Sequence, residues 1–347
     1  MKVVIDEKIP FLKDALSRMG HVVYAMPGNR ISKNDIHDAE ALFVRTRTIC
    51  DASLLDDTSI EFIGTATIGY DHIDRNYCHT HNIKWTNAPG CNADAVLQYI
   101  QCTIYSWAKR NNIAQEDITL GVIGVGQIGQ RVAKWAASAG MRLLLNDPPR
   151  EAAGEQGFAP LEKIADECNV ITFHPTLTKD GDYPSFHLAD SRFFLSLRKR
   201  PLIINASRGP VVDNTALLEA CNNNLIGAAA IDVWENEPDI NISLLNKAYI
   251  ATPHIAGYSA EGKLNATRMM IEAFAAHTNY TKELPHIALP FPENRDISAH
   301  TIQEALLQIY SPEDETAALK NNPEKFEDLR NNYKLRREPS AYNITII

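Results

Sequence analysis

Residues 121–130 read Gly-Val-Ile-Gly-Val-Gly-Gln-Ile-Gly-Gln, and the fold can be predicted outward from this stretch. The apolar run at residues 119–123 predicts a β-strand, and residues 127–139 have the pattern of a helix. Between them lies a Gly-x-Gly-x-x-Gly loop, whose backbone N–H groups can surround a pyrophosphate together with the helix N-terminus. The three glycines of this loop are Gly124, Gly126 and Gly129.

A second apolar run, residues 142–145, leads to Asp147, which stands about 20 residues beyond the loop, where a carboxylate can bind the ribose of a dinucleotide. The glycine spacing alone is weak, because glycines also mark ordinary turns. Strand, loop, helix, strand and acid in this order predict a dinucleotide site. Because a carboxylate repels a 2′-phosphate, Asp147 favours NAD over NADP, and Arg150 is the nearby residue that keeps NADP open.

The composition is that of a globular protein, and it excludes several classes of function. Of the 347 residues, 45% are hydrophobic and 22% are charged, and the formal net charge is −9. No basic stripe could neutralise many phosphates, so we expect no nucleic-acid partner. No apolar run approaches the roughly 20 residues that span a bilayer, so we expect a cytoplasmic protein without a membrane segment. The six cysteines lack paired or ligand-like spacing, which predicts reduced thiols and no metal site.

Strands and helices alternate along the chain and predict two parallel α/β units followed by a charged tail. The first unit has expected strands at residues 3–5, 22–25, 42–44, 62–64 and 83–86, and a long helix at 93–110 follows it. The second has expected strands at residues 119–123, 142–145, 170–173, 202–205, 228–231 and 249–251. The predicted domains are 1–92 with 256–282 for substrate, 93–255 for dinucleotide, and 283–347, with short helices at 300–310 and 326–333, for docking or dimerisation.

Each strand of the second unit is followed by polar or glycine-rich residues. In an open parallel sheet these groups lie along one edge, outside the carboxyl ends of the strands, where ligands bind. The same argument makes the strand ends of the first unit candidates for substrate contacts, although residues 64–71 could equally form a simple Gly/Thr-rich turn. The groups expected at the edge of the second sheet are Asp147, His174, Thr176, Arg208, Asp232 and His254.

Three of the polar residues have the chemistry for hydride transfer beside a carboxylate. His254 can move a proton near neutral pH, and a carboxylate on its other ring nitrogen would fix the tautomer. Glu237 is placed for that role, with Glu235 as the local competitor. Arg208 has a planar guanidinium that can bind a substrate carboxylate with two hydrogen bonds. A single histidine, glutamate or arginine at such a position more often has a structural role than a catalytic one. The prediction of a catalytic site therefore rests on the shared position of the three residues at the ligand edge.

Four linked motifs resemble the D-isomer-specific 2-hydroxyacid dehydrogenases. They are the glycine loop, Asn205-Ala206-Ser207-Arg208-Gly209, Asp232-Val233-Trp234-Glu235-Asn236-Glu237-Pro238 and Thr252-Pro253-His254-Ile255-Ala256-Gly257. The resemblance implies an α/β fold with a Rossmann-type doubly wound sheet, a flavodoxin-like substrate domain completed by the helix after His254, and NAD as cofactor. It implies that Arg208, Glu237 and His254 are catalytic. The implied cofactor contacts are Gly124, Gly126, Gln127, Ile128, Gly129, Asp147, Thr176, Asp232 and Gly257.

The resemblance also extends to the substrate and the tail. The tail pattern Phe326-x-x-Leu329-Arg330-x-Asn332-Tyr333-x-x-Arg336-Arg337-Glu338 implies a small α+β domain that forms a homodimer, and a phosphorylated 2-hydroxy acid as substrate. The implied substrate contacts are Thr46, Thr67 and Tyr258, and we expect the backbone N–H groups around Ile68 and Gly69 to share the substrate carboxylate. For the phosphate we rank Arg45 first, with Arg47 and the pair Arg336-Arg337 as alternatives. Two other functions stay open: a dehydrogenase for another 2-hydroxy acid, of the phosphoglycerate, glycerate or lactate type, and a non-catalytic NAD(H)-binding regulator.

Overall fold

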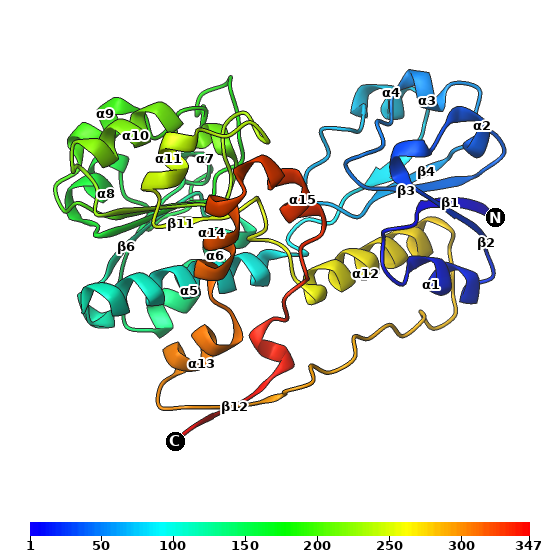
Figure 1. Ribbon diagram of the computed structural model, residues 1–347. Helices are drawn as coiled ribbons and strands as arrows, with labels where there is room; N and C mark the ends of the chain where they lie inside the picture. Colours follow the sequence, from blue (N-terminus) through cyan, green and yellow to red (C-terminus); the bar gives the residue numbers. More distant parts are fainter. The chain divides into compact units, whose positions relative to one another are not determined.

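The computed structural model describes all residues 1–347 and divides into two compact units. Unit 1 comprises residues 1–92 and 259–291, and unit 2 comprises residues 93–258 and 292–347 (Figure 1). No helix is both long and apolar enough to cross a membrane. All six cysteines are free thiols, and four of them are buried, as expected.

Unit 1 is built on a five-stranded parallel sheet with the order β2-β1-β3-β4-β5, the flavodoxin order that the resemblance implied. Its central strands are buried along their whole length because helices cover both faces of the sheet. One face packs Phe43 and Phe62 against Phe274 of the returning helix α12. The strands are β1 (Lys2–Asp6), β2 (Val22–Met26), β3 (Ala41–Val44), β4 (Phe62–Thr65) and β5 (Lys84–Thr86); the helices are α1 (Leu12–Arg18), α2 (Lys33–Ile36), α3 (Ala52–Leu55), α4 (Arg75–Thr80) and α12 (Ala260–His277).

Unit 2 is built on a six-stranded parallel sheet with the order β11-β10-β9-β8-β6-β7. The strand order reverses beside β6, so the glycine loop that follows β6 lies at the switch point where such sheets bind ligands. All six expected strands are present, within one residue at each end. They are β6 (Thr119–Ile123), β7 (Arg142–Asn146), β8 (Val170–Phe173), β9 (Leu202–Asn205), β10 (Ala228–Ile231) and β11 (Ile250–Ala251); the helices are α5 (Ala93–Asn111), α6 (Gln127–Ser138), α7 (Pro148–Ala152), α8 (Leu161–Glu167), α9 (Ser191–Ser196), α10 (Asn214–Asn222) and α11 (Ile242–Lys247).

Of the C-terminal residues, 292–347 group with unit 2 and 283–291 group with unit 1. In Figure 1, α14 lies beside β11 and α13 lies beside α5. The two-residue strand β11 is the edge of the sheet, and Ala251 N donates to Thr316 Oγ1 of α14 at 3.0 Å, so this helix covers the edge. The elements are β12 (Asp296–Ala299), α13 (Ile302–Ile309), α14 (Pro312–Asn321), α15 (Phe326–Asn331) and β13 (Asn343–Ile346); β12 and β13 pair in parallel, and neither they nor α14 were expected.

Candidate active site

The glycine loop has the shape that a pyrophosphate requires. Gly124 has a φ of +84°, and a Cβ there would lie 2.4 Å from Pro175 N. A Cβ at Gly129 would lie 2.1 Å from Gly124 O, so helix α6 and the loop touch through this glycine. Gly126 is different, because a Cβ there would meet nothing within 4 Å. Two glycines therefore shape the loop, and Gly126 leaves open space at the N-terminus of α6.

Asp147 lies directly after β7, with its carboxylate held at the glycine loop. Its Oδ2 accepts a hydrogen bond from Val125 N at 2.7 Å, and its Oδ1 accepts one from Arg150 N at 3.2 Å. The Arg150 guanidinium is engaged by Glu155 and by the Val125 carbonyl. Because Arg150 is paired with Glu155, the loop offers the carboxylate of Asp147, which was predicted to bind the ribose, and no uncommitted arginine; this arrangement fits NAD.

The remaining predicted cofactor residues lie at the same edge of the unit 2 sheet. Gln127 and Ile128 form the first turn of α6, and Thr176 follows β8, with its carbonyl accepting from Ser185 Oγ at 2.6 Å. Asp232 is buried at the end of β10 and accepts hydrogen bonds from Thr252 Oγ1, Ile255 N and Ala256 N. Burial raises the pKa of Asp232, although the nearby His254 and these hydrogen bonds act to lower it. Asp232 thus holds the loop that carries His254 and Gly257 in place, and its contact with the cofactor remains a prediction.

His254 and Glu237 form the hydrogen-bonded pair that the sequence predicted. His254 Nδ1 lies 2.8 Å from Glu237 Oε2, and Glu237 Oε1 accepts from Trp234 N at 2.8 Å. The His254 backbone has a φ of +59°, which is held by a hydrogen bond from its N–H to Asp232 O at 2.8 Å. With Nδ1 occupied by Glu237, Nε2 is the ring nitrogen left to meet a substrate.

The pKa of Glu237 is set by opposing contributions. Burial favours the neutral acid, but the hydrogen bond and charge of His254, the N–H of Trp234 and the nearby Arg330 outweigh it. The net effect lowers the pKa of Glu237 below its ordinary value. Glu237 is therefore a carboxylate at neutral pH, as a partner for an imidazolium must be.

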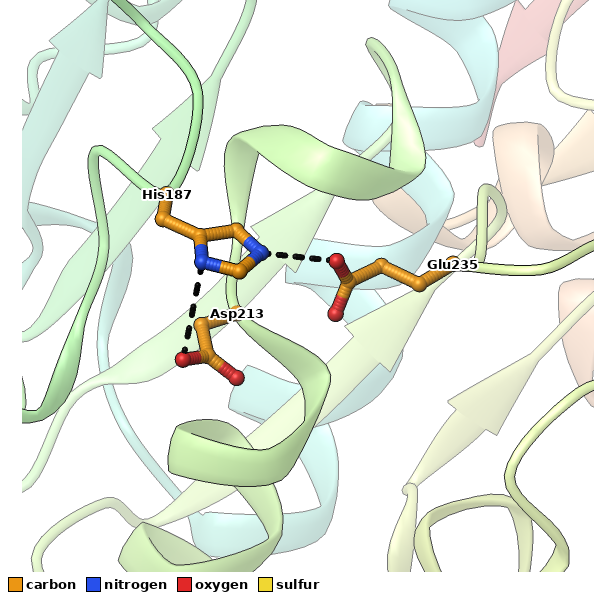
Figure 2. A group of neighbouring side chains, drawn as sticks. All are labelled: His187, Asp213 and Glu235. Carbon is orange, nitrogen blue, oxygen red and sulfur yellow. Dashed lines mark hydrogen bonds and ion pairs between the residues drawn. The ribbon is translucent and has the colours of Figure 1, made fainter.

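Glu235, the competing partner, belongs to a different group (Figure 2). Its Oε1 lies 2.7 Å from His187 Nε2, and its Oε2 accepts from Asn214 N at 2.8 Å. The other ring nitrogen of His187 lies 3.7 Å from Asp213 Oδ2. His187, Asp213 and Glu235 are residue types that bind metal ions, but Figure 2 shows the two carboxylates at different nitrogens of one ring. We interpret the group as structural: its contacts hold the loop of His187, the start of α10 and the loop of Glu235 together.

Arg208 follows β9 and is exposed at the same sheet edge. Its Nη1 donates to the Ser207 carbonyl at 2.8 Å, and its side chain forms no ion pair, so the guanidinium is available to a substrate carboxylate. A Cβ at Gly209 would lie 2.0 Å from Trp234 O. Glycine at this position therefore lets the Arg208 loop lie directly against the loop that carries Glu237.

The predicted substrate residues of unit 1 follow β3 and β4. Arg45 Nε lies 2.9 Å from Oδ2 of the buried Asp6, at the end of the neighbouring strand β1. Thr67 Oγ1 donates to Gly69 O at 2.8 Å, and Asn87 Nδ2 donates to Ile68 O at 2.7 Å. Residues 67–69 are thus a hydrogen-bonded loop, and Arg45 and Thr46 stand at the adjacent strand end.

The structure contradicts one candidate for the phosphate ligand. Arg336 is buried, and its guanidinium donates to Gln98 Oε1 and to the carbonyls of Ala95, Ile255, Ala256 and Tyr258. All five N–H groups are used within unit 2. Arg336, an alternative candidate ranked below Arg45, therefore has no N–H group left for a phosphate, because the sequence shows a basic pair but not which member is buried.

One residue near the pair was not predicted as part of the site. Arg330, at the end of α15, lies 3.8 Å from Glu237 Oε2. The tail pattern contained this arginine, but nothing in the sequence relates the tail to a glutamate more than 90 residues earlier.

Comparison with known proteins gives the class to which this fold and site belong. Residues 98–256 match the family described as D-isomer specific 2-hydroxyacid dehydrogenase, NAD binding domain. D-lactate dehydrogenase from Aquifex aeolicus, complexed with NAD and lactic acid, superposes with a TM-score of 0.62 at 25% identity, over 80% of this chain and 96% of that chain. D-2-hydroxyisocaproate dehydrogenase shares the fold with a TM-score of 0.68 at 18% identity, over 81% of this chain and 98% of that one.

The chain belongs to the D-isomer-specific 2-hydroxyacid dehydrogenase family, and its cofactor is NAD. Within that family it is similar to erythronate-4-phosphate dehydrogenase from Bacteroides thetaiotaomicron, at 50% identity over 99% of both chains. The enzyme of the same name from Porphyromonas gingivalis is 39% identical over 99% of this chain and 95% of that one. Both similarities extend over nearly the whole chain and so include the C-terminal residues.

Proposed function

We propose that this protein oxidises the C2 hydroxyl of 4-phospho-D-erythronate to (R)-3-hydroxy-2-oxo-4-phosphooxybutanoate, with NAD⁺ as the acceptor, in pyridoxal 5′-phosphate (vitamin B6) biosynthesis. The observation that carries the proposal is the His254–Glu237 pair at 2.8 Å, with an exposed Arg208 on the adjoining loop. The full-length similarity to erythronate-4-phosphate dehydrogenases supports the choice of substrate.

Each of the three side chains has a separate role in the reaction. His254 Nε2 accepts the proton of the C2 hydroxyl, and Glu237 holds the ring through Nδ1 and stabilises the imidazolium. Arg208 binds the C1 carboxylate with its guanidinium and so orients C2. The glycine loop and Asp147 would hold NAD⁺, which would supply the acceptor for the hydride of C2. The hydrogen bonds from Trp234 N and His254 fix the Glu237 carboxylate, so little reorganisation is needed when the ring becomes charged.

The proposal is tested by mixing the purified protein with NAD⁺ and 4-phospho-D-erythronate and following the NADH absorbance. A parallel reaction contains a 2-oxo acid, because NADH that stays bound could otherwise hide turnover. D-3-phosphoglycerate, D-glycerate and D-lactate are compared under the same conditions. A higher kcat/KM for one of these three would assign a different substrate. Tight NADH binding without hydride transfer from any 2-hydroxy acid would favour the regulator.

Replacing Arg45 with alanine is expected to raise the KM for 4-phospho-D-erythronate about tenfold or more, because a charged hydrogen-bond donor to the phosphate is lost. Kinetics with the phosphorylated substrate and with D-erythronate measure this effect. Asp6 pairs with Arg45 and is buried, so the single variant also leaves a charge unpaired. The double variant Asp6→Asn with Arg45→Ala removes both charges and is the matched control. Unchanged kinetics on the phosphorylated substrate in both variants would remove Arg45 from the site.

We also propose a cytoplasmic homodimer that assembles through the C-terminal residues. A two-stranded ribbon such as β12–β13 is only marginally stable by itself, and Ile346 and Ile347 at its end are exposed. Light scattering after size exclusion measures the state, and a monomer at micromolar concentration would contradict the proposal.

A further inference from the structure

The last turn of α15 lies beside the candidate catalytic pair of unit 2. Arg330 Nη1 is 3.8 Å from Glu237 Oε2, the same oxygen that faces His254 Nδ1 at 2.8 Å. The Arg330 side chain also makes a hydrogen bond with the side chain of Tyr258. One residue of the C-terminal segment therefore contacts both a candidate catalytic carboxylate and a candidate substrate residue.

This ion pair is partly shielded from water. Only 18% of the Glu237 side chain and 27% of the Arg330 side chain are exposed. Burial opposes the charge on Arg330, but the contacts with Tyr258 and the carboxylates of Glu237 and Glu327 outweigh it and raise the pKa of Arg330. In such a setting a charge acts on its neighbours more strongly than it would in bulk water.

The contact is held in place by the segments on either side of it. Phe326, at the start of α15, is 1% exposed and packs in the core of unit 2. After α15, Tyr333 donates its hydroxyl to Glu315 at 2.9 Å and packs edge-on against Tyr258 at 6.3 Å. Arg336 then binds the carbonyls of Ile255, Ala256 and Tyr258, directly after His254. The tail is thus tied to the same loop that carries the imidazole.

The charged groups around the pair act in different directions. Glu237 lies at Nδ1 of His254, the buried Asp232 lies behind the His254 loop, and both carboxylates favour a protonated ring. Arg330 is the cation that faces Glu237, with Glu327 and the Tyr258 phenol beside it. Without Arg330, no arginine or lysine would form an ion pair with Glu237.

We propose that Arg330 is a positioning residue for the catalytic pair, which holds the Glu237 carboxylate against His254 and whose charge limits protonation of the imidazole. The inference rests on the proposed oxidation, in which His254 must begin without a proton on Nε2. With a cation beside it, the Glu237 carboxylate can still accept the hydrogen bond that orients the ring. The cation also opposes early protonation of the ring, so that Nε2 stays able to accept a proton from the substrate. It assigns a function in the active site to the C-terminal segment of the same chain.

The test is the pH profile of kcat/KM for oxidation in Arg330→Met, Arg330→Lys and Lys334→Met. In Arg330→Met the imidazole should retain its proton to higher pH. The rising limb of the plot of kcat/KM against pH should therefore shift to higher pH by about half a pH unit or more. Arg330→Lys retains a charge and should keep the limb close to that of the unaltered protein. Lys334 is an exposed cation of the same tail, so Lys334→Met controls for loss of charge alone and should not move the limb.

Three outcomes would overturn the inference. The first is an unmoved limb in Arg330→Met, including the case in which kcat falls equally at every pH. The second is a higher KM for the phosphorylated substrate alone, without movement of the limb, since Arg330 would then be a substrate ligand. The third is an equal shift in Lys334→Met. If Arg330→Met fails to fold, Arg330→Gln retains a donor to Tyr258 without the charge and should show the same shift.

A second readout separates this inference from the proposed function. NMR titration follows the imidazole resonance of His254, which is assigned by its absence in His254→Asn. The titration midpoint should be higher in Arg330→Met than in the unaltered protein, whatever the substrate. Equal midpoints would contradict the inference even if 4-phospho-D-erythronate is oxidised, and a raised midpoint would support it even if another 2-hydroxy acid is the substrate.

Discussion

Replacing His254 with asparagine is expected to lower kcat for oxidation by about 10²- to 10⁴-fold, the range over which a positioned general base contributes. The substrate hydroxyl then has no group that accepts its proton as the hydride leaves. Asparagine suits the position, because His254 has a φ of +59° and asparagine tolerates this conformation better than most residues. Steady-state kinetics with NAD⁺ and 4-phospho-D-erythronate give the loss, and the Kd for NADH should stay within a few-fold of its original value.

The two neighbouring glutamates provide a matched control for this account. Glu237→Gln should lower kcat by at least about tenfold, because an amide can orient the ring but cannot stabilise its positive charge. Glu235→Gln should leave kcat within a few-fold, since Glu235 binds His187 and Asn214 N. The reverse order of the two effects, or an active His254→Asn, would show that the base lies elsewhere.

Replacing Arg336 with methionine is expected to lower the free energy of unfolding of unit 2 by about 3–5 kcal/mol, as removal of a buried charged partner commonly does. The substitution removes five hydrogen bonds, one to Gln98 Oε1 and four to backbone carbonyls. It also removes the cation that lies 4.4 Å from the centre of the Tyr310 ring. Urea unfolding followed by tryptophan fluorescence measures the effect.

Two further variants make the Arg336 result specific. Lys334→Met removes an exposed charge from the same tail and should change stability by no more than about 0.5 kcal/mol. Arg336→Lys keeps the charge but has three N–H donors for five acceptors, so it should fall between the two. If Arg336→Met unfolded at the same urea concentration as Lys334→Met, Arg336 would not anchor the tail.

The sequence predicted the two sheets because their strands carry a strong local signal. Runs such as 119–123 and 202–205 are apolar and end in glycine or polar residues, so both the strand and its ligand edge can be recognised. The tail carried no such signal. The helix α14 begins Pro-Glu-Asp-Glu-Thr, and β12 and β13 pair only with each other across more than 40 residues. The burial of α14 depends on contacts with α5 and β11, which a local pattern does not reveal.

The candidate site shows the same division. The sequence favoured Glu237 as the partner of His254, with Glu235 as the local competitor, and the fold shows that Glu237 faces His254 while Glu235 faces His187. Arg336 was one of the candidates for the phosphate, ranked below Arg45, yet it is buried behind the loop of His254. Arg330 had no expected role, because its contact with Glu237 joins two motifs that are remote in the chain.

Transfer of the C2 hydrogen is the most direct measurement of the central claim. The protein is mixed with NAD⁺ and 4-phospho-D-erythronate that carries deuterium at C2, and the reduced cofactor is analysed by mass spectrometry and NMR. We expect one deuterium at C4 of the nicotinamide for each 2-oxo acid formed. Reduced cofactor without the label, or deuterium lost to water without formation of NADH, would contradict hydride transfer from C2.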